Sequence, residues 1–454
     1  MTHPYIPNAE PGVRAEMLAA IGVPSVEEFY ADIPADLRLD RPLDLPEPFV
    51  AEYDLVRHMR GLLGNTTDTV QALSFLGHGC YPHHVPAVCD EVNSRSEFLT
   101  AYAGEPYEDH GRFQALFEYV SMMGELLEMD VVNVPTYDGF QAAGTALRMA
   151  ARYTGRAKVL VGAAISGDKL SKLRDFLAPD IEIVLAATDD DGEFARVVDG
   201  RILTADAARV PFDESFAAIY LETPNVYGVV ETRGRELADL AHAHGALLVV
   251  GADPISLGVL APPAAYGADI VCGDIQSLGI HQNYGGGHAG YIATHDHERL
   301  VAEFPSRLFG IAPTKVPGEY GFGDVFYDRT SFALREEGKE WVGTAAALWG
   351  ITAGVYLALM GPQGMKDLGE VVLARTRYAM DALAKFAEVL HAGAVHFREF
   401  AIRVPDAHAL LAALRAENIY GGVPLDDRTL LVCVTERHSI ADIDRLVQAV
   451  KEAL

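Results

Sequence analysis

The chain has 454 residues, half of them hydrophobic, and carries a formal net charge of −28 at pH 7. This length suits two domains and an extension, and the hydrophobic fraction is large enough to build a sizeable core. Nucleic acids and anionic membranes bind clusters of Lys and Arg, so the acidic excess argues against both and favours a small molecule or a protein as partner. The 4 cysteines show no close pair spacing and the N-terminus does not resemble a signal peptide, which predicts reduced thiols in a cytoplasmic protein without a transmembrane segment.

Residues 1–65 are predicted to form an N-terminal arm that wraps a neighbouring subunit. Short helical patterns over 13–21 and 26–32 are separated by prolines, which break any long element.

A turn rich in Gly, His and Tyr follows the arm and contains Tyr81 and His83. His78, Cys80, His83 and His84 are residue types that bind zinc, but a second ligand pair at a set spacing is missing. We therefore predict no metal site here and favour a pocket or interface role. The next polar and aromatic loop, over 100–110, contains Thr100, Tyr102 and Tyr107, which we expect to face a partner's site or simply to pack at an interface.

Residues 66–330 show a repeating pattern of strands and helices, which predicts a doubly wound, mainly parallel sheet. Ligands bind such sheets at the carboxyl ends of the strands. A turn with Asp138 and Gly139 leads into a helix expected over 140–153, whose first amides can hold a phosphate. Strands are expected near 158–165, 181–187, 217–222, 246–250 and 270–272.

Two of these expected strands end in polar residues. Asp253 follows the strand at 246–250, and a loop with Gln276 and Ser277 follows the strand at 270–272. In fold-type-I pyridoxal-phosphate (PLP) enzymes, an aspartate at the first position pairs with the pyridinium nitrogen, and a lysine after the next strand holds the cofactor. No lysine occurs between Lys172 and Lys315. Asp253 is therefore either a pyridinium partner or a relic that caps the turn before Pro254.

Residues 331–454 are predicted to form a small C-terminal α/β domain. An apolar stretch near 345–361 is slightly short for a membrane span and contains glycines, which favours a buried or interface helix. The segment 309–327 before this domain, rich in Gly, Pro and Tyr, is expected to be a loop. Two helical stretches from about residue 340 are followed by a strand, a helix, a strand and a helix over 395–404, 407–416, 430–434 and 440–453.

Several blocks of the sequence resemble the subunit 1 (alpha) family of the two-subunit glycine decarboxylase P-protein. The likeness runs in register over nearly the whole chain, and its most specific blocks are SFLGHGCYPHHVPAV, SRSEFLTAY, QALFEYVSMMGELLEMDVVN and ADPISLGVLAPPAAYGADIVCGD. The resemblance implies a fold-type-I PLP-dependent transferase (aminotransferase-like) domain that has lost its lysine. It also implies a lysine-bearing subunit 2 (beta) partner, doubled into a heterotetramer, that binds the PLP.

The resemblance implies that the complex decarboxylates glycine on PLP and passes the aminomethyl group to the lipoyl arm of H-protein. This chain would then contribute no catalytic lysine and hold no PLP covalently. Substrate or partner-site positions would be Tyr81, His83, Thr100, Tyr102 and Tyr107, and a vestigial cofactor pocket would contain Asp138, Gly139, Asp253, Gln276 and Ser277.

The segments 103–110 and 334–343 depart from the family pattern. Three alternatives therefore stay open: a divergent paralogue in another amino-acid decarboxylation or a specialised pathway, a purely structural assembly subunit, and a free-standing enzyme that uses its pocket without the lysine.

Overall fold

The computed structural model describes residues 5–68, 72–98, 110–198, 200–340 and 346–454. The chain forms two compact units, Met1–Thr67 and Asp68–Leu454. The first unit contains the helices α1 (Pro11–Ile21) and α2 (Glu52–Leu63). The Glu10 side chain caps the start of α1, and Gly22 ends it in the left-handed conformation at φ 83°. No residue of either helix is buried.

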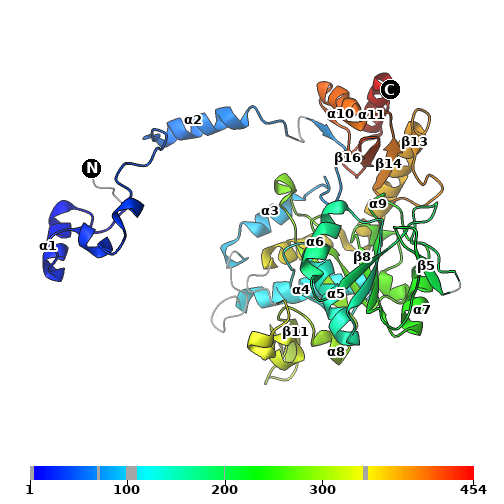
Figure 1. Cartoon of the computed structure of the whole chain (residues 1–454), viewed down its shortest axis with the longest axis horizontal. Helices are drawn as coiled ribbons and strands as arrows, with labels where there is room; N and C mark the ends of the chain where they lie inside the picture. The colour runs from blue at the N-terminus through cyan, green and yellow to red at the C-terminus, as the bar shows by residue number, and fades with distance from the viewer. Residues whose placement is uncertain (1–4, 69–71, 99–109, 199, 341–345) are drawn as a thin grey trace. The chain divides into compact units, whose positions relative to one another are not determined.

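The second unit (Figure 1) is built around a seven-stranded sheet. The strand order in this sheet is β2-β10-β9-β8-β7-β3-β4. The pairings from β4 to β9 are parallel, and the pairings of β10 with β9 and β2 are antiparallel. This arrangement confirms the predicted mainly parallel sheet. The strands are β2 (Val131–Val132), β3 (Lys158–Gly162), β4 (Glu182–Ala186), β7 (Ala218–Thr223), β8 (Leu247–Ala252), β9 (Ile270–Asp274) and β10 (Gly290–Thr294).

Side chains alternate between two hydrophobic cores, one on each face of this sheet. On β3, Val159 and Val161 pack with α5 (Gly139–Thr154) and α6 (Gly167–Leu177), whereas Leu160 belongs to the opposite core. That opposite core is completed by α4 (His110–Leu127), α7 (Gly234–Ala243) and α9 (Ala347–Leu383). Helices on both faces explain why the parallel strands are continuous apolar runs.

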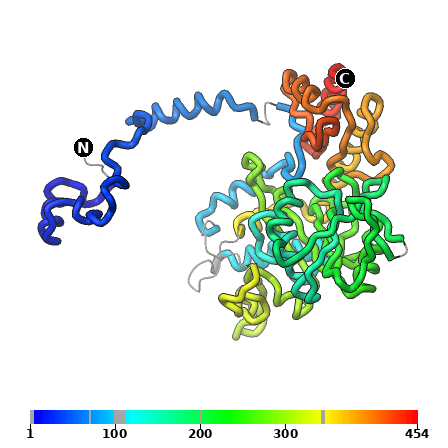
Figure 2. Tube along the Cα trace, viewed as in Figure 1, coloured from blue at the N-terminus to red at the C-terminus, as the bar shows by residue number. Residues whose placement is uncertain are grey.

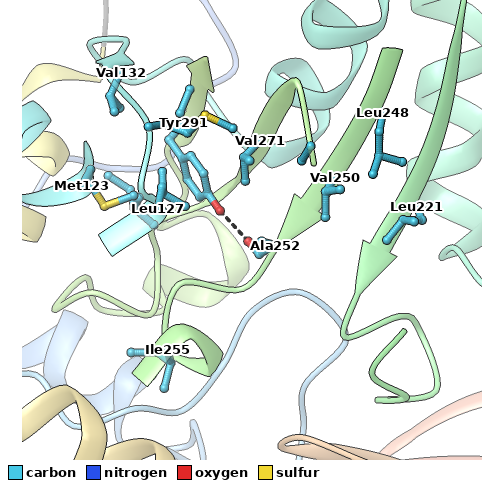
Figure 3. Close-up of a cluster of buried hydrophobic side chains, with 14 of the residues drawn as sticks. Met123, Leu127, Val132, Leu221, Leu248, Val250, Ala252, Ile255, Val271 and Tyr291 are labelled. Carbon is cyan, nitrogen blue, oxygen red and sulfur yellow. Dashed lines mark hydrogen bonds between the residues drawn. The ribbon is translucent and has the colours of Figure 1, made fainter. Parts of the chain in front are cut away.

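Figure 3 shows part of this opposite core, where Tyr291 of β10 lies near Met123 and Leu127 of α4 and Val271 of β9. The hydroxyl of Tyr291 donates a hydrogen bond of 2.7 Å to the carbonyl of Ala252. Because a buried phenol needs a partner, this bond satisfies the tyrosine and ties β10 to the end of β8, where the site begins.

The C-terminal part of the second unit is a small α/β lobe, orange to red in Figure 2. Its antiparallel sheet has the order β13-β14-β17-β16 and packs its own core against α10 and α11. A short parallel pair, β1 (Leu73–Ser74) with β15 (Ile419–Tyr420), brings the segment after residue 74 to this lobe. The elements are β13 (Glu388–Val389), β14 (Glu399–Arg403), α10 (Ala407–Ala416), β16 (Val423–Asp426), β17 (Thr429–Cys433) and α11 (Ile440–Ala453).

The two helical stretches predicted after residue 340 are joined in α9, which is interrupted at Gly361 with φ 59° just before Pro362. The expectation of a loop over 309–327 was wrong in part, because β11 (Phe309–Pro313) and β12 (Tyr320–Asp324) form an antiparallel hairpin. Glycines weaken the alternating pattern of both strands, and Gly318 at φ 85° allows the connecting turn. The remaining elements are α3 (Ala87–Asn93), α8 (Glu298–Val301) and a second hairpin, β5 (Arg201–Leu203) with β6 (Arg209–Pro211).

Within the described ranges, no helix combines the length and hydropathy that crossing a membrane requires.

Candidate functional site

A cavity of about 300 Å³ lies at the carboxyl ends of β7, β8 and β9. Gly139 from the start of α5 and Asp253 from the end of β8 both line it, as expected for the edge of a doubly wound sheet where ligands bind. Other lining residues are Cys80, Tyr81, Lys169, Glu222, Asp274, Gln276, Ser277, His288, Arg398 and Glu399.

The first amides of α5, predicted to suit a phosphate, are already bonded to two carboxylates. Asp138 caps the helix and accepts a 2.7 Å hydrogen bond from the amide of Gln141. Asp274, at the end of β9, accepts a 2.9 Å bond from the amide of Gly139. A phosphate at this helix end would have to displace the two carboxylates from these amides and would lie beside their negative charges. The positive end of the helix dipole is thus already compensated by carboxylates of the same chain.

Asp253 forms a buried ion pair with the guanidinium of Arg398, which immediately precedes β14 in the small lobe. The side chains of Arg398 and Asp253 are only 4% and 10% exposed. Asp253 also accepts a 3.1 Å bond from the amide of Ile255. The carboxylate thus bonds to the turn that follows it, and its charge is neutralised by an arginine of the same chain.

Lys169 is the one lysine among the described residues that line the cavity, and it forms a short ion pair with Glu222. Burial lowers the pKa of Lys169, but the charge of Glu222 outweighs it and the net pKa is raised. The ion pair with Glu222 favours the ammonium form of Lys169, which is not a nucleophile. Lys315 lies outside the cavity, between the strands of the β11–β12 hairpin.

His83 connects the Asp253–Arg398 pair to the small lobe. Its Nε2 accepts a 2.7 Å hydrogen bond from Arg398, so its Nδ1 carries the proton and donates to Glu436 at 2.7 Å. Burial raises the pKa of Glu436, but the hydrogen bonds from His83 and from the amide of His84 overcome this and lower it to about 2. The histidine is thus fixed in position and tautomer.

Tyr81 is held at both its backbone and its side chain. Gln276 accepts from the amide of Tyr81 at 2.8 Å and donates to its carbonyl at 3.2 Å. The guanidinium of Arg398 lies 3.4 Å from the centre of the ring, and the hydroxyl donates to Glu399 at 3.0 Å. The structure therefore brings Tyr81, His83, Asp253 and Gln276 into one bonded network, with Ser277 on the cavity wall.

Thr100, Tyr102 and Tyr107 lie outside the described residues. Among those that are described, no three His, Cys, Asp or Glu side chains are grouped to hold a metal ion.

Sequence reasoning missed Arg398, Glu399 and Glu436, which complete the network. The sequence signal for them was the adjacent charged pair Arg398 and Glu399 in a mostly apolar expected strand, because adjacent charges at buried positions require partners. Asp274 follows the strand predicted at 270–272, so it could have been proposed as a site residue on the same grounds as Asp253.

The model of one protein family, the glycine cleavage system P-protein, matches residues 3–450. The chain belongs to this family. It is 35% identical to a probable glycine dehydrogenase (decarboxylating) subunit 1 of Saccharolobus islandicus, over 100% of this chain and 98% of that protein. A protein of the same name from Chlorobium phaeobacteroides is also 35% identical, with 98% of each chain covered.

A solved structure of the same family is similar to this chain in both sequence and fold. A glycine decarboxylase P-protein in inhibitor-bound form superposes with a TM-score of 0.84 and 32% identity, over 98% of each chain. A glutamate decarboxylase of Lactobacillus brevis shares the fold at a TM-score of 0.66 and 13% identity, over 92% of this chain and 96% of that one. The fold is that of fold-type-I PLP-dependent enzymes, as predicted from the resemblance.

The residues of this chain do not fit PLP, although the family uses it. The loop after β9 offers no lysine, carboxylates take the amides of α5, and Asp253 is paired with Arg398. A lysine for an aldimine is thus missing from this loop, and the amides of Gly139 and Gln141 and the carboxylate of Asp253 already have partners.

Proposed function

We propose that this chain is the subunit of a glycine decarboxylase that holds no cofactor and completes the active site of a lysine-bearing subunit 2 homologue. The observation that carries the proposal is the set of bonds in the cavity. The residues that would otherwise be available to a cofactor, Asp253 and the first amides of α5, are bonded to other residues of this chain. The relatives' name, subunit 1 of a glycine dehydrogenase, supports a second subunit. The assembled complex would decarboxylate glycine on the partner's PLP and transfer the aminomethyl group to lipoylated H-protein.

In this proposal the Asp253–Arg398–His83–Glu436 network has a positioning role. It joins the end of β8, the turn 78–84 and the small lobe, so that the turn is held rigidly. Residues Thr100, Tyr102 and Tyr107 follow this turn and would face the partner's site. Rigid support matters because a misplacement of about 1 Å can cost roughly 100-fold in rate.

The N-terminal unit would dock on the same partner. Its helix α2 carries an apolar stripe at positions i, i+4, i+7 and i+8, formed by Leu55, Met59, Leu62 and Leu63, with exposed fractions of 44%, 44%, 53% and 56%. Such a stripe is typical of a helix that packs against another surface. A partner subunit that covered it would bury the apolar area.

Mixing the purified full-length chain with the lysine-bearing subunit, PLP and lipoylated H-protein tests the proposal. Exchange of the glycine carboxyl group with labelled bicarbonate is expected only with both subunits, and each alone should give less than roughly one hundredth of that rate. Full activity of subunit 2 alone would reduce this chain to an assembly protein. Activity of this chain alone would establish a free-standing enzyme, and exchange with another amino acid but not glycine would identify a divergent paralogue.

A further inference from the structure

An arginine surrounded by three carboxylates joins the loop after β4 to the turn that leads into α7. Nη2 of Arg233 donates to Asp189 at 2.8 Å, and its Nε donates to Glu193 at 3.2 Å. The carboxylate of Glu231 lies 3.5 Å from the same Nε. The side chains of Arg233, Glu193 and Glu231 are 11%, 11% and 6% exposed, and that of Asp189 is 23% exposed. One cation thus faces three carboxylates in a place that is largely closed to water.

Glu193 and Glu231 compete for a single N–H group. Nε of Arg233 carries one proton, which it donates to Glu193, and Glu193 also accepts from the amide and the hydroxyl of Thr232 at 3.1 and 2.8 Å. Glu231 accepts from the amides of Phe194 and Arg233 at 2.7 and 3.0 Å. Because two buried carboxylates that face one cation repel each other, one of them retains a proton to a higher pH than an exposed carboxyl does. Glu231 is the more buried of the two and has the weaker contact with Nε, so it is the one that retains the proton.

The other titratable groups around Glu231 agree with this assignment. Burial, opposed by the amide of Phe194 and aided by Glu193, raises the pKa of Glu231 to about 7. Burial also raises the pKa of Glu193, but its hydrogen bonds outweigh this and the net pKa is lowered. Tyr266, from the turn Pro263–Tyr266, is the neighbour on the other side, and burial followed by the charge of Glu231 raises its pKa. This phenol therefore stays neutral, and Arg233 is the cation that faces Glu231 in the described part of the chain.

The loop 189–194 contacts both the cavity wall and the small lobe. Asn225, which lines the cavity, donates to the carbonyl of Gly192 at 2.8 Å. Nδ1 of His391, in the small lobe, lies 3.0 Å from the carbonyl of Asp190. Gly192 has φ 78°, and a Cβ at this residue would lie 2.7 Å from the ring of His391. Because the loop and the lobe fit this closely, a shift of the loop would reach both the lobe and the cavity.

We propose that Glu193, Glu231 and Arg233 form a proton-dependent latch that regulates the fit of the loop 189–194 to the cavity wall and the small lobe. When Glu231 is protonated, the latch is closed. When Glu231 loses its proton, a second buried negative charge lies beside Glu193, and the loop moves away so that water can reach this charge.

The direction of the pH dependence follows from the two states of Glu231. In the open state the carboxyl is hydrated and titrates near its ordinary pKa of 4.5, whereas in the closed state it titrates at about 7. The stabilisation of the closed state is therefore complete below the lower value and is lost as the pH rises through the higher one. The latch lies within this chain and does not depend on the decarboxylation proposed above.

Hydrogen–deuterium exchange of the full-length chain, read by mass spectrometry at about pH 5.5 and about pH 8, tests the proposal. After correction for the intrinsic effect of pH on exchange, the protection of the amides of Phe194 and Thr232 should fall by about 10- to 100-fold between these values. Glu231→Gln should remove this fall, because glutamine does not ionise. Glu236→Gln is the matched control, since it removes a carboxylate from an exposed position of α7 and should leave the fall unchanged.

Equal protection at both pH values in the native chain would overturn the proposal, and so would an unchanged fall in a folded Glu231→Gln variant. If that variant does not fold, the native chain still decides. The amide of Ala409, which donates to the carboxylate of Asp406 at 2.9 Å, is the internal control and should keep its protection. A fall at Ala409 as large as that at Phe194 would indicate general loosening of the chain and would also overturn the latch.

Discussion

Replacing Arg398 by methionine in the full chain is expected to lower the free energy of unfolding by about 3–5 kcal/mol, the usual cost of removing one partner of a buried ion pair. Methionine has a Cβ and much of the volume of arginine. The left-handed backbone of residue 398, at φ 64°, is therefore equally strained in the native protein and in the variant. What changes is that Asp253 stays buried without a counter-charge and His83 loses its donor. Denaturant unfolding at pH 7 measures the difference.

Arg403→Met is the matched control for this substitution. Arg403 ends β14, the strand that Arg398 immediately precedes. Its side chain is 44% exposed and approaches Glu388 only at 4.0 Å, so its loss should cost less than about 1 kcal/mol. Adding Asp253→Asn to Arg398→Met should restore part of the lost stability, since the double variant no longer buries an unpaired charge. Equal costs for the two arginine substitutions would show that the Asp253–Arg398 pair does not hold the site together.

The double substitution Leu55→Gln and Met59→Gln in α2 is expected to weaken association with the subunit 2 partner by about 10- to 100-fold. Burying a fully exposed side chain of this size is worth about 1.5–3 kcal/mol. Each of these two is 44% exposed in the free chain, so the pair contributes about 1.4–2.8 kcal/mol, and 1.4 kcal/mol corresponds to a tenfold change in affinity. Glutamine is a good helix former, so the helix should remain. Sedimentation or size-exclusion chromatography over a concentration series measures the dissociation constant.

The control exchanges two polar side chains of the same helix, Arg57 and Arg60, for glutamine. Arg57 makes an exposed pair with Asp54, which contributes little to stability. We expect this variant to assemble within about threefold of the native affinity. If the apolar and the polar substitutions weakened association equally, or neither did, the docking role proposed for the N-terminal unit would be wrong.

The sheet and half of the site were predictable because they depend on local patterns. Strands such as β8 and β9 are apolar runs of the right length, and the residues at their ends, Asp253 and Gln276, therefore face the ligand edge. Arg398 lies 145 positions from Asp253, and nothing local to either residue specifies their pairing. That contact exists only because the small lobe packs beside the sheet.

The same limit applies to the phosphate site. The sequence predicts a helix whose first amides attract an anion. It does not show that this anion is the carboxylate of Asp274, which comes from a strand far along the chain. The hairpin of β11 and β12 was missed for another reason, since its glycines conceal the alternating pattern that predicts a strand.

Borohydride trapping of PLP in the assembled complex, followed by peptide mapping, tests the central claim most directly. Reduction fixes PLP to whichever lysine holds it. We predict about one pyridoxyl group per subunit 2 lysine site and no stoichiometric label on any of the 8 lysines of this chain, because Lys169, which lines the cavity, is paired with Glu222. A label approaching one per chain on Lys169, or on any other lysine of this chain, would contradict the assignment of a subunit that holds no cofactor.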